Sequence, residues 1–160
     1  NSRIGIFNQP TKGMRAQALL ALDKVGLRQK ADENYRNLSE GQKQLCIAAR
    51  TIVSNAKLMI LDEPESALDI TNRYEMLRTI REQADTNKCV LMSIHSPELA
   101  LMYCDRLLFM KSGSIVDDIY VKDTDVSRLN EAFAKVYDNV CVGVYESTDN
   151  RKHYCIYPKI

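Results

Sequence analysis

Two adjacent carboxylates and one histidine have types and positions suited to chemistry in this 160-residue chain. Asp62 and Glu63 follow the apolar run KLMIL at residues 57–61, and His95 follows the apolar run CVLMSI at residues 89–94. Because successive side chains leave opposite faces of a strand, one carboxylate could hold a metal ion while the other activates water. Taken alone, an Asp-Glu-Pro sequence more often simply ends a strand, and a histidine at a strand end is more often structural.

A polar segment, NLSEGQ at residues 37–42, precedes a helical pattern of apolar residues. Ser39 and Gln42 match the capping box, in which the serine oxygen accepts a backbone N–H and the glutamine side chain reaches back. A helix N-terminus that presents free amides, a serine and Gly41 could also accept a phosphate group. By itself, however, this segment predicts only a capped helix. The apolar positions that follow share one helix face: Leu45, Ala48, Ala49, Ile52 and Val53.

The order of the remaining patterns predicts an α/β fold. Helical spacing of apolar residues predicts five helices, at residues 14–25, 39–53, 70–84, 97–104 and 126–136. Apolar runs predict six strands, at residues 57–61, 89–94, 106–110, 114–120, 140–145 and 153–157. Alternating strands and helices imply a mainly parallel sheet flanked by helices. We expect the first two strands to be buried on both faces, and Tyr74, Leu77 and Ile80 of the third helix to point inward.

The composition argues against several kinds of partner. The chain has 22 basic and 21 acidic residues and a formal charge of +1, so nothing in its charge favours nucleic acid or an anionic membrane surface. The longest apolar runs are far shorter than the roughly 20 residues of a membrane-spanning helix. The five cysteines lack metal-ligand spacing, so we expect reduced thiols in a cytosolic protein. Since the chain starts at Asn1 and not at a methionine, we expect a fragment of a longer protein.

Taken together and in order, these segments resemble the ATP-binding subunit of ABC transporters. LSEGQ at residues 38–42 resembles the signature loop, usually LSGGQ, and LMILDEP at residues 58–64 resembles the Walker B strand with its catalytic glutamate. SALD at residues 66–69 resembles the D-loop, and His95 resembles the switch histidine. YCDRLLFMKSGSIV, at residues 103–116, matches the strand–turn–strand that follows in the family.

The resemblance implies a P-loop NTPase-like fold divided in two. Residues 1–50 would be part of the helical subdomain, ending with the signature motif, and residues 51–160 would be the C-terminal part of the ATPase core. Residues 1–7, NSRIGIF, are followed by a helix that ends in VGL at residues 25–27, and this part resembles importer subunits that serve ferric-siderophore, haem and cobalamin uptake. The short C-terminal tail after residues 131–145 also resembles theirs. Such a subunit would lie on the cytoplasmic face of the cell membrane, held there by permease subunits and working indirectly with a substrate-binding protein.

In this family two ATPase domains pair head to tail and share their ATP. The resemblance implies that Ser39, Gly41 and Gln42 contact the γ-phosphate of ATP held by the partner domain. Asp69 would bridge the two domains.

The resemblance also gives roles to the strand-end residues. Asp62 would help to hold Mg²⁺ through water, and Glu63 would act as the general base or orient the attacking water. His95 would contact the γ-phosphate. The implied cofactors are therefore ATP and Mg²⁺.

The chain departs from the family pattern in one large respect. It contains no G-x-x-x-x-G-K-[ST] phosphate loop, and Gln9 lies too close to Leu38 to be the Q-loop glutamine. Smaller departures are Glu65, commonly Thr, and Ser96, commonly Asp; we expect both to be peripheral to the chemistry. We predict that residues 1–160 alone neither bind ATP tightly nor hydrolyse it, and that the exposed sheet could pair with another copy.

Two alternatives remain open from the sequence. One is a truncated, non-catalytic subunit that supplies only a signature loop in trans. The other is an ABC ATPase with no transport role. The transported molecule cannot be read from this chain.

Overall fold

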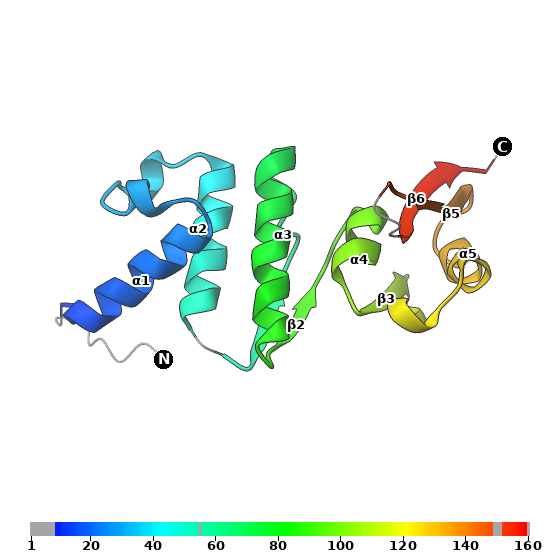
Figure 1. Cartoon of the computed structure of the whole chain (residues 1–160), viewed down its shortest axis with the longest axis horizontal. Coiled ribbons are helices and arrows are strands. Elements are labelled where there is room, and N and C mark those ends of the chain that lie inside the picture. Colours follow the sequence, from blue (N-terminus) through cyan, green and yellow to red (C-terminus); the bar gives the residue numbers. More distant parts are fainter. Residues whose placement is uncertain (1–8, 55, 149–151, 160) are drawn as a thin grey trace. The chain divides into compact units, whose positions relative to one another are not determined.

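The computed structural model describes residues 9–54, 56–148 and 152–159 (Figure 1). The expected importer-like segment at residues 1–7 therefore lies outside the described residues. The chain divides into two compact units, Asn1–His95 and Ser96–Ile160. The boundary expected at residue 50 falls inside the first unit and stays a prediction.

The first unit begins with helical elements whose ends follow local capping rules. They are α1 (Lys12–Lys24), η1 (Arg28–Lys30), η2 (Tyr35–Asn37) and α2 (Glu40–Val53). The side chain of Thr11 caps α1 by accepting the N–H of Met14, and Gly26 follows the helix with a φ of 70° that suits glycine. Leu45, Ala48 and Ala49 of α2 are buried. The helices predicted over residues 14–25 and 39–53 are confirmed.

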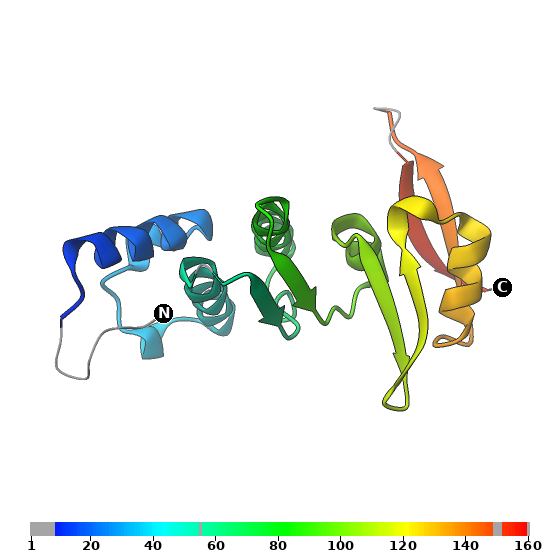
Figure 2. The same ribbon diagram turned by 90° about the horizontal axis from the view of Figure 1, so that it is seen from below.

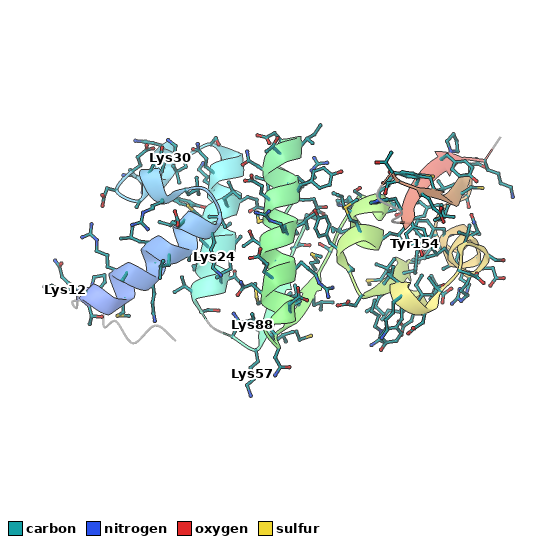
Figure 3. All side chains as sticks on the ribbon, in the orientation of Figure 1. Lys12, Lys24, Lys30, Lys57, Lys88 and Tyr154 are labelled. Carbon is teal, nitrogen blue, oxygen red and sulfur yellow. The ribbon has the colours of Figure 1, made fainter. Side chains whose placement is uncertain are left out.

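A strand–helix–strand unit completes the first unit. Strands β1 (Leu58–Leu61) and β2 (Cys89–Met92) pair in parallel, and α3 (Ile70–Asp85) connects them. Leu58 lies beside Cys89 and Leu61 beside Met92. Lys57 and Lys88, labelled in Figure 3, mark the amino ends of the two strands, so both carboxyl ends lie at the opposite edge.

Two burial predictions for this unit were wrong. Met59 and Leu61 are buried, but Leu58 is 52% and Ile60 68% exposed, so β1 is buried on one face only. No residue of β2 is buried, and Leu91 is 50% exposed. An unbroken apolar run permits burial on both faces, whereas actual burial requires an element packed on each face. Tyr74 is 42% exposed, because the buried stripe of α3 runs through residues 76–83 and leaves position 74 at its edge.

The second unit contains two antiparallel hairpins and two helices. Its elements are α4 (Pro97–Tyr103), β3 (Arg106–Lys111), β4 (Ser114–Tyr120), η3 (Val121–Asp123), α5 (Val126–Ala134), β5 (Val140–Glu146) and β6 (Lys152–Pro158). Ser112 and Gly113 both have positive φ and form the two-residue turn between β3 and β4. Helix α5 lies against β5 (Figure 2). The predicted helices and strands of this unit are confirmed.

Helix α5 carries the core of the second unit. Leu129 and Phe133 are fully buried, and the Phe133 ring meets that of Phe109 edge to face with centroids 5.1 Å apart. The side-chain amide of Asn130 donates to the carbonyl of Val142 and accepts its N–H, both at 2.9 Å. This pair of hydrogen bonds fixes α5 against β5.

Among the described residues no cysteine forms a disulfide, and burial raises the pKa of Cys46. In the part of the chain that the structure describes, no helix is long and apolar enough to cross a membrane.

A buried carboxylate on β4 joins the hairpin to the segment around α5. Asp117 accepts hydrogen bonds from Arg128, one of them at 2.8 Å, and pairs with Lys135 at 2.9 Å. The Arg128 hydrogen bonds, with a further one from Lys135, hold the pKa of Asp117 well below its usual range, although burial acts in the opposite direction. A depressed native pKa stabilises the fold above the unfolded-state pKa, and this stability is lost as the pH falls.

Asp117→Asn should therefore lower the melting temperature at pH 7 more than at pH 2. In the wild type we expect the Asp117 contribution to be complete above about pH 4, the pKa of an unfolded aspartate, and to fall progressively as the pH is lowered from there to pH 2. Thermal unfolding followed by circular dichroism between pH 2 and pH 7 measures this. Asp138→Asn, at an exposed position of the same unit, is the control. An equal decrease in the melting temperature of Asp117→Asn at both pH values would contradict the stabilising role of the ionised Asp117 carboxylate.

Candidate functional site

The carboxyl end of β1 carries the two predicted carboxylates on an unusual backbone. Asp62 and Glu63 directly follow Leu61, and Glu63 has a φ of 44°, in the left-handed region. For a residue other than glycine this conformation costs on the order of 1–3 kcal/mol and is concentrated at functional sites. Ser66 stabilises it by donating its N–H and its hydroxyl to the Glu63 carbonyl, at 3.2 and 3.1 Å.

Ser93 joins the end of β2 to this carboxylate pair. Its Oγ donates to Asp62 Oδ1 at 2.6 Å and accepts the N–H of Glu63 at 2.9 Å. The sequence did not single out Ser93, although a polar residue inside the run CVLMSI was a signal that could have found it.

His95 lies against the predicted general base. Its Nε2 is 2.6 Å from Glu63 Oε1, and the side chains are 75% and 42% exposed respectively. The ring and the carboxylate therefore remain accessible to a ligand while they contact each other. The structure thus brings Asp62, Glu63 and His95 together at one edge of the β1–β2 pair.

Glu65 is closer to this site than expected. It is 3% exposed, and its Oε1 accepts the backbone N–H of His95 at 3.2 Å. Its Oε2 is buried and has no hydrogen-bond partner among the described residues. Glu65 was predicted to be peripheral, but its side chain contacts the backbone of His95. The pairing of β2 with β1 brings the His95 amide to it.

The predicted signature residues form the start of α2. The capping box is complete: Gln42 N donates to Ser39 Oγ at 3.2 Å, and Ser39 N donates to Gln42 Oε1 at 3.1 Å. Both side chains are therefore engaged locally. The amides of Glu40 and Gly41 precede the first intrahelical hydrogen bond of α2 and could bind an anion.

Gly41 allows α2 to approach the SALD segment. A Cβ at this position would lie 2.9 Å from the carbonyl oxygen of Ala67 and 3.4 Å from Leu68. Asp69 caps α3 by accepting the N–H of Asn72 at 2.9 Å, and this hydrogen bond lowers the pKa of Asp69. The signature and D-loop residues are thus neighbours.

One further side chain connects α2 to the backbone of Glu63. Gln44 donates Nε2 to the carbonyl of Glu63 at 3.5 Å. The helix that carries Ser39 and Gly41 therefore contacts the backbone of Glu63. Sequence reasoning missed Gln44, whose place on the helix face next to the apolar stripe was the available signal.

The donor set fits a magnesium ion held together with a phosphate better than one held by protein alone. Among the described residues no cluster of three or more His, Cys, Asp or Glu side chains could hold a metal ion. A single carboxylate such as Asp62 is typical of magnesium sites in which phosphate oxygens and water supply the remaining ligands.

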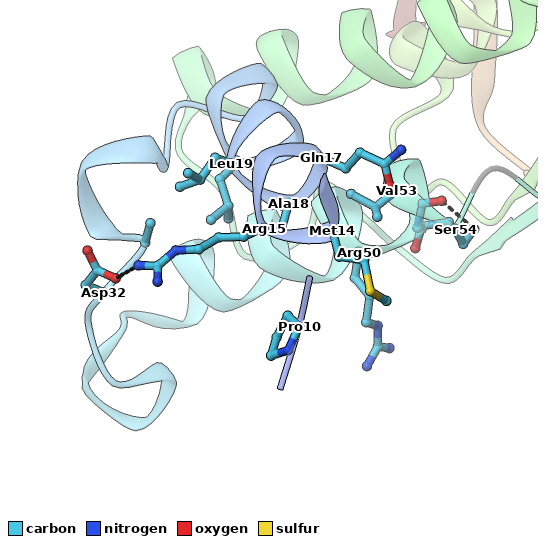
Figure 4. A pocket seen from close by; sticks show the side chains of 13 residues that line it. Pro10, Met14, Arg15, Gln17, Ala18, Leu19, Asp32, Arg50, Val53 and Ser54 are labelled. Atoms are coloured by element: carbon cyan, nitrogen blue, oxygen red, sulfur yellow. Dashed lines mark hydrogen bonds and ion pairs between the residues drawn. The ribbon is translucent and has the colours of Figure 1, made fainter. Parts of the chain in front are cut away.

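The first unit also has a cavity of about 930 Å³ between α1 and α2 (Figure 4). Its lining includes Met14, Ala18 and Val53, with the Arg15–Asp32 ion pair at its edge, 3.1 Å between nitrogen and oxygen. None of the predicted site residues lines it.

Residues 2–66 match the family model described as "ABC transporter". The chain is 39% identical over 126 residues to the phosphonates import ATP-binding protein PhnC of Mesoplasma florum, covering 78% of this chain and 51% of that protein. It is 38% identical over 114 residues to the arginine transport ATP-binding protein ArgV of Corynebacterium glutamicum, covering 71% and 45%. The chain spans about half the length of the curated relatives it matches.

Solved structures confirm the expected α/β, P-loop NTPase fold class. An inward-facing transporter described as of the metal-chelate ABC type matches with a TM-score of 0.80 at 25% identity, over 98% of this chain and 62% of that one. The dimeric ABC transporter cassette MJ0796 matches with a TM-score of 0.67 at 22% identity, over 72% and 50%. The second likeness shows the fold alone.

Gly41→Ala should destabilise the first unit despite the better helix propensity of alanine. The clash with the Ala67 carbonyl should cost about 1–3 kcal/mol, more than the roughly 1 kcal/mol gained from propensity. Urea unfolding measures the change. Gly13→Ala is a matched control, because Gly13 is also the second residue of a helix and its Cβ would meet only Thr11 Oγ1, at 3.9 Å. Stabilisation of both variants would contradict the close approach.

Proposed function

We propose that this chain, which belongs to the ABC transporter ATP-binding family, supplies the signature loop, the Walker B carboxylates and the switch histidine of an ATPase that drives import. One observation carries the proposal: Glu63 and His95 contact each other at 2.6 Å beside Asp62. A general base must be able to reach the proton that it abstracts, and the 42% exposure of the Glu63 side chain leaves its carboxylate accessible to a water molecule.

The strand-end cluster divides the chemistry among its members. Asp62 would hold magnesium through water, and the ion would neutralise charge on the phosphate groups. Glu63 would orient the attacking water or accept its proton. His95, which contacts Glu63 in this structure, would form a hydrogen bond to the γ-phosphate when ATP is present. Both side chains are exposed enough for a phosphate group to reach the histidine ring.

The signature residues would act on a second nucleotide. The amides at the start of α2, together with Ser39, Gly41 and Gln42, would contact the γ-phosphate of ATP held by a partner ATPase domain, where the positive end of the helix dipole favours an anion. Asp69 would bridge the two domains. The dimeric form of the MJ0796 cassette supports pairing of this kind.

For the cargo we propose the group of iron-siderophore, haem or cobalamin importers. The likeness to a metal-chelate type transporter over 98% of the chain supports this choice. The phosphonate and arginine names of other relatives point to the alternative that the cargo lies outside this group. Permease subunits would hold the ATPase at the inner face of the membrane and would choose the cargo.

These 160 residues alone should not bind MgATP with micromolar affinity. This sequence contains no phosphate loop and no phosphate-loop lysine, which would bind the phosphate groups of ATP. Isothermal titration calorimetry with MgATP measures the affinity, and the complete PhnC of Mesoplasma florum is a control for the assay. A Kd in the micromolar range for this chain would contradict the prediction.

In the intact protein that carries these residues, Glu63→Gln should abolish turnover. We expect at least a 100-fold loss of kcat, within the usual contribution of general acid–base catalysis, while ATP-driven pairing of the domains survives. Phosphate release and light scattering measure the two properties. Glu82→Gln, at an exposed position of α3, is the matched control. Normal turnover in Glu63→Gln would remove Glu63 from its role. If the wild-type protein itself pairs but does not hydrolyse ATP, the result would instead favour a subunit that only supplies a signature loop.

A further inference from the structure

The hydroxyl of Ser93 makes two hydrogen bonds, and both reach the carboxylate pair at the end of β1. Its proton is donated to Asp62 Oδ1, and its oxygen accepts the N–H of Glu63. A serine hydroxyl has only one proton, so its donor capacity is fully used by Asp62. The side chain that directly follows β2 thus fixes a carboxylate and the adjoining backbone at the same time.

The placement of Ser93 follows from the sheet and not from a flexible loop. The register of β1 and β2 continues one residue further, because Ser93 N donates to the Leu61 carbonyl at 3.1 Å. The backbone of Ser93 is therefore anchored to the last residue of β1. Its side chain can hold the next two residues without further ordering of the chain.

Glu63 requires support on both sides of its left-handed backbone. Ser66 stabilises the carbonyl side, and Ser93 provides the hydrogen bond on the N–H side. A strained conformation persists only where its surroundings fix it. The direction in which the Glu63 side chain leaves the strand, toward His95, therefore depends on the Ser93 hydroxyl.

We propose that Ser93 is a positioning residue of the ATP-hydrolysing site, a role that rests on the function proposed above. By engaging Oδ1 of Asp62 it would leave Oδ2 as the oxygen that could accept a hydrogen bond from a magnesium-bound water. By engaging the Glu63 amide it aims the general base. Ser93 acts through these two residues and does not itself touch the reacting atoms.

Three variants of this chain test the hydrogen bond. Ser93→Ala removes the hydroxyl, Ser93→Thr keeps it on a β-branched side chain that a strand tolerates, and Ser114→Ala changes an exposed serine of β4. Hydrogen–deuterium exchange of the Glu63 amide, followed by NMR, should be about tenfold faster in Ser93→Ala, as expected for the loss of one hydrogen bond. Ser93→Thr and Ser114→Ala should exchange at the wild-type rate. An unchanged rate in Ser93→Ala would overturn the proposal.

Turnover in the intact protein then tests positioning against a merely structural role. Ser93→Ala should lower kcat for ATP hydrolysis about tenfold and leave KM for ATP within about twofold, because an interaction that aims the base acts on the chemical step. Ser93→Thr should restore kcat. An unchanged kcat in Ser93→Ala, despite fast exchange at Glu63, would overturn the positioning role. Absence of ATP hydrolysis in the wild type would overturn the proposed function, and the exchange result would then report a structural bond only.

Discussion

The parallel register of β1 with β2 is the constraint on which the candidate site depends. With Leu61 beside Met92, both strands end at the same edge, and the residues that follow meet there: Asp62 and Glu63 from one strand, Ser93 and His95 from the other. A shift of one residue would turn every side chain of one strand to the other face. The contact between Glu63 and His95 is therefore a product of strand pairing as much as of the residues themselves.

Local rules explain what the sequence predicts well. The capping box of Ser39 and Gln42 depends on four consecutive residues, and the structure has it complete. The glycine after α1 and the turn at residues 112–113 likewise depend on nearby backbone conformation. The pair Asp62 and Glu63 and the residue His95 follow two apolar runs, so they are expected at one edge of the sheet, where the ends of parallel strands meet. Their direct contact was not predicted.

Contacts between distant segments explain what the sequence predicts poorly. The apolar run of β1 could not tell which face is covered, because that depends on what packs against it; Leu58 and Ile60 remain exposed. The roles of Ser93 and Glu65 depend on partners 31 and 30 residues away. A polar residue within an apolar run is the one sequence signal at Ser93, and nothing in the type or spacing of Glu65 marks it as part of a site. The pairing of the strands brings both residues there.

If the proposed function is right, Glu63 and His95 act as one unit in ATP hydrolysis. A double-mutant cycle of Glu63→Gln and His95→Ala, measured by single-turnover hydrolysis in the intact protein, tests it most directly, because residues that act together have non-additive effects. We predict that the double variant is slower than the slower single variant by no more than about threefold. A double variant whose loss equals the product of the two single losses would contradict the claim.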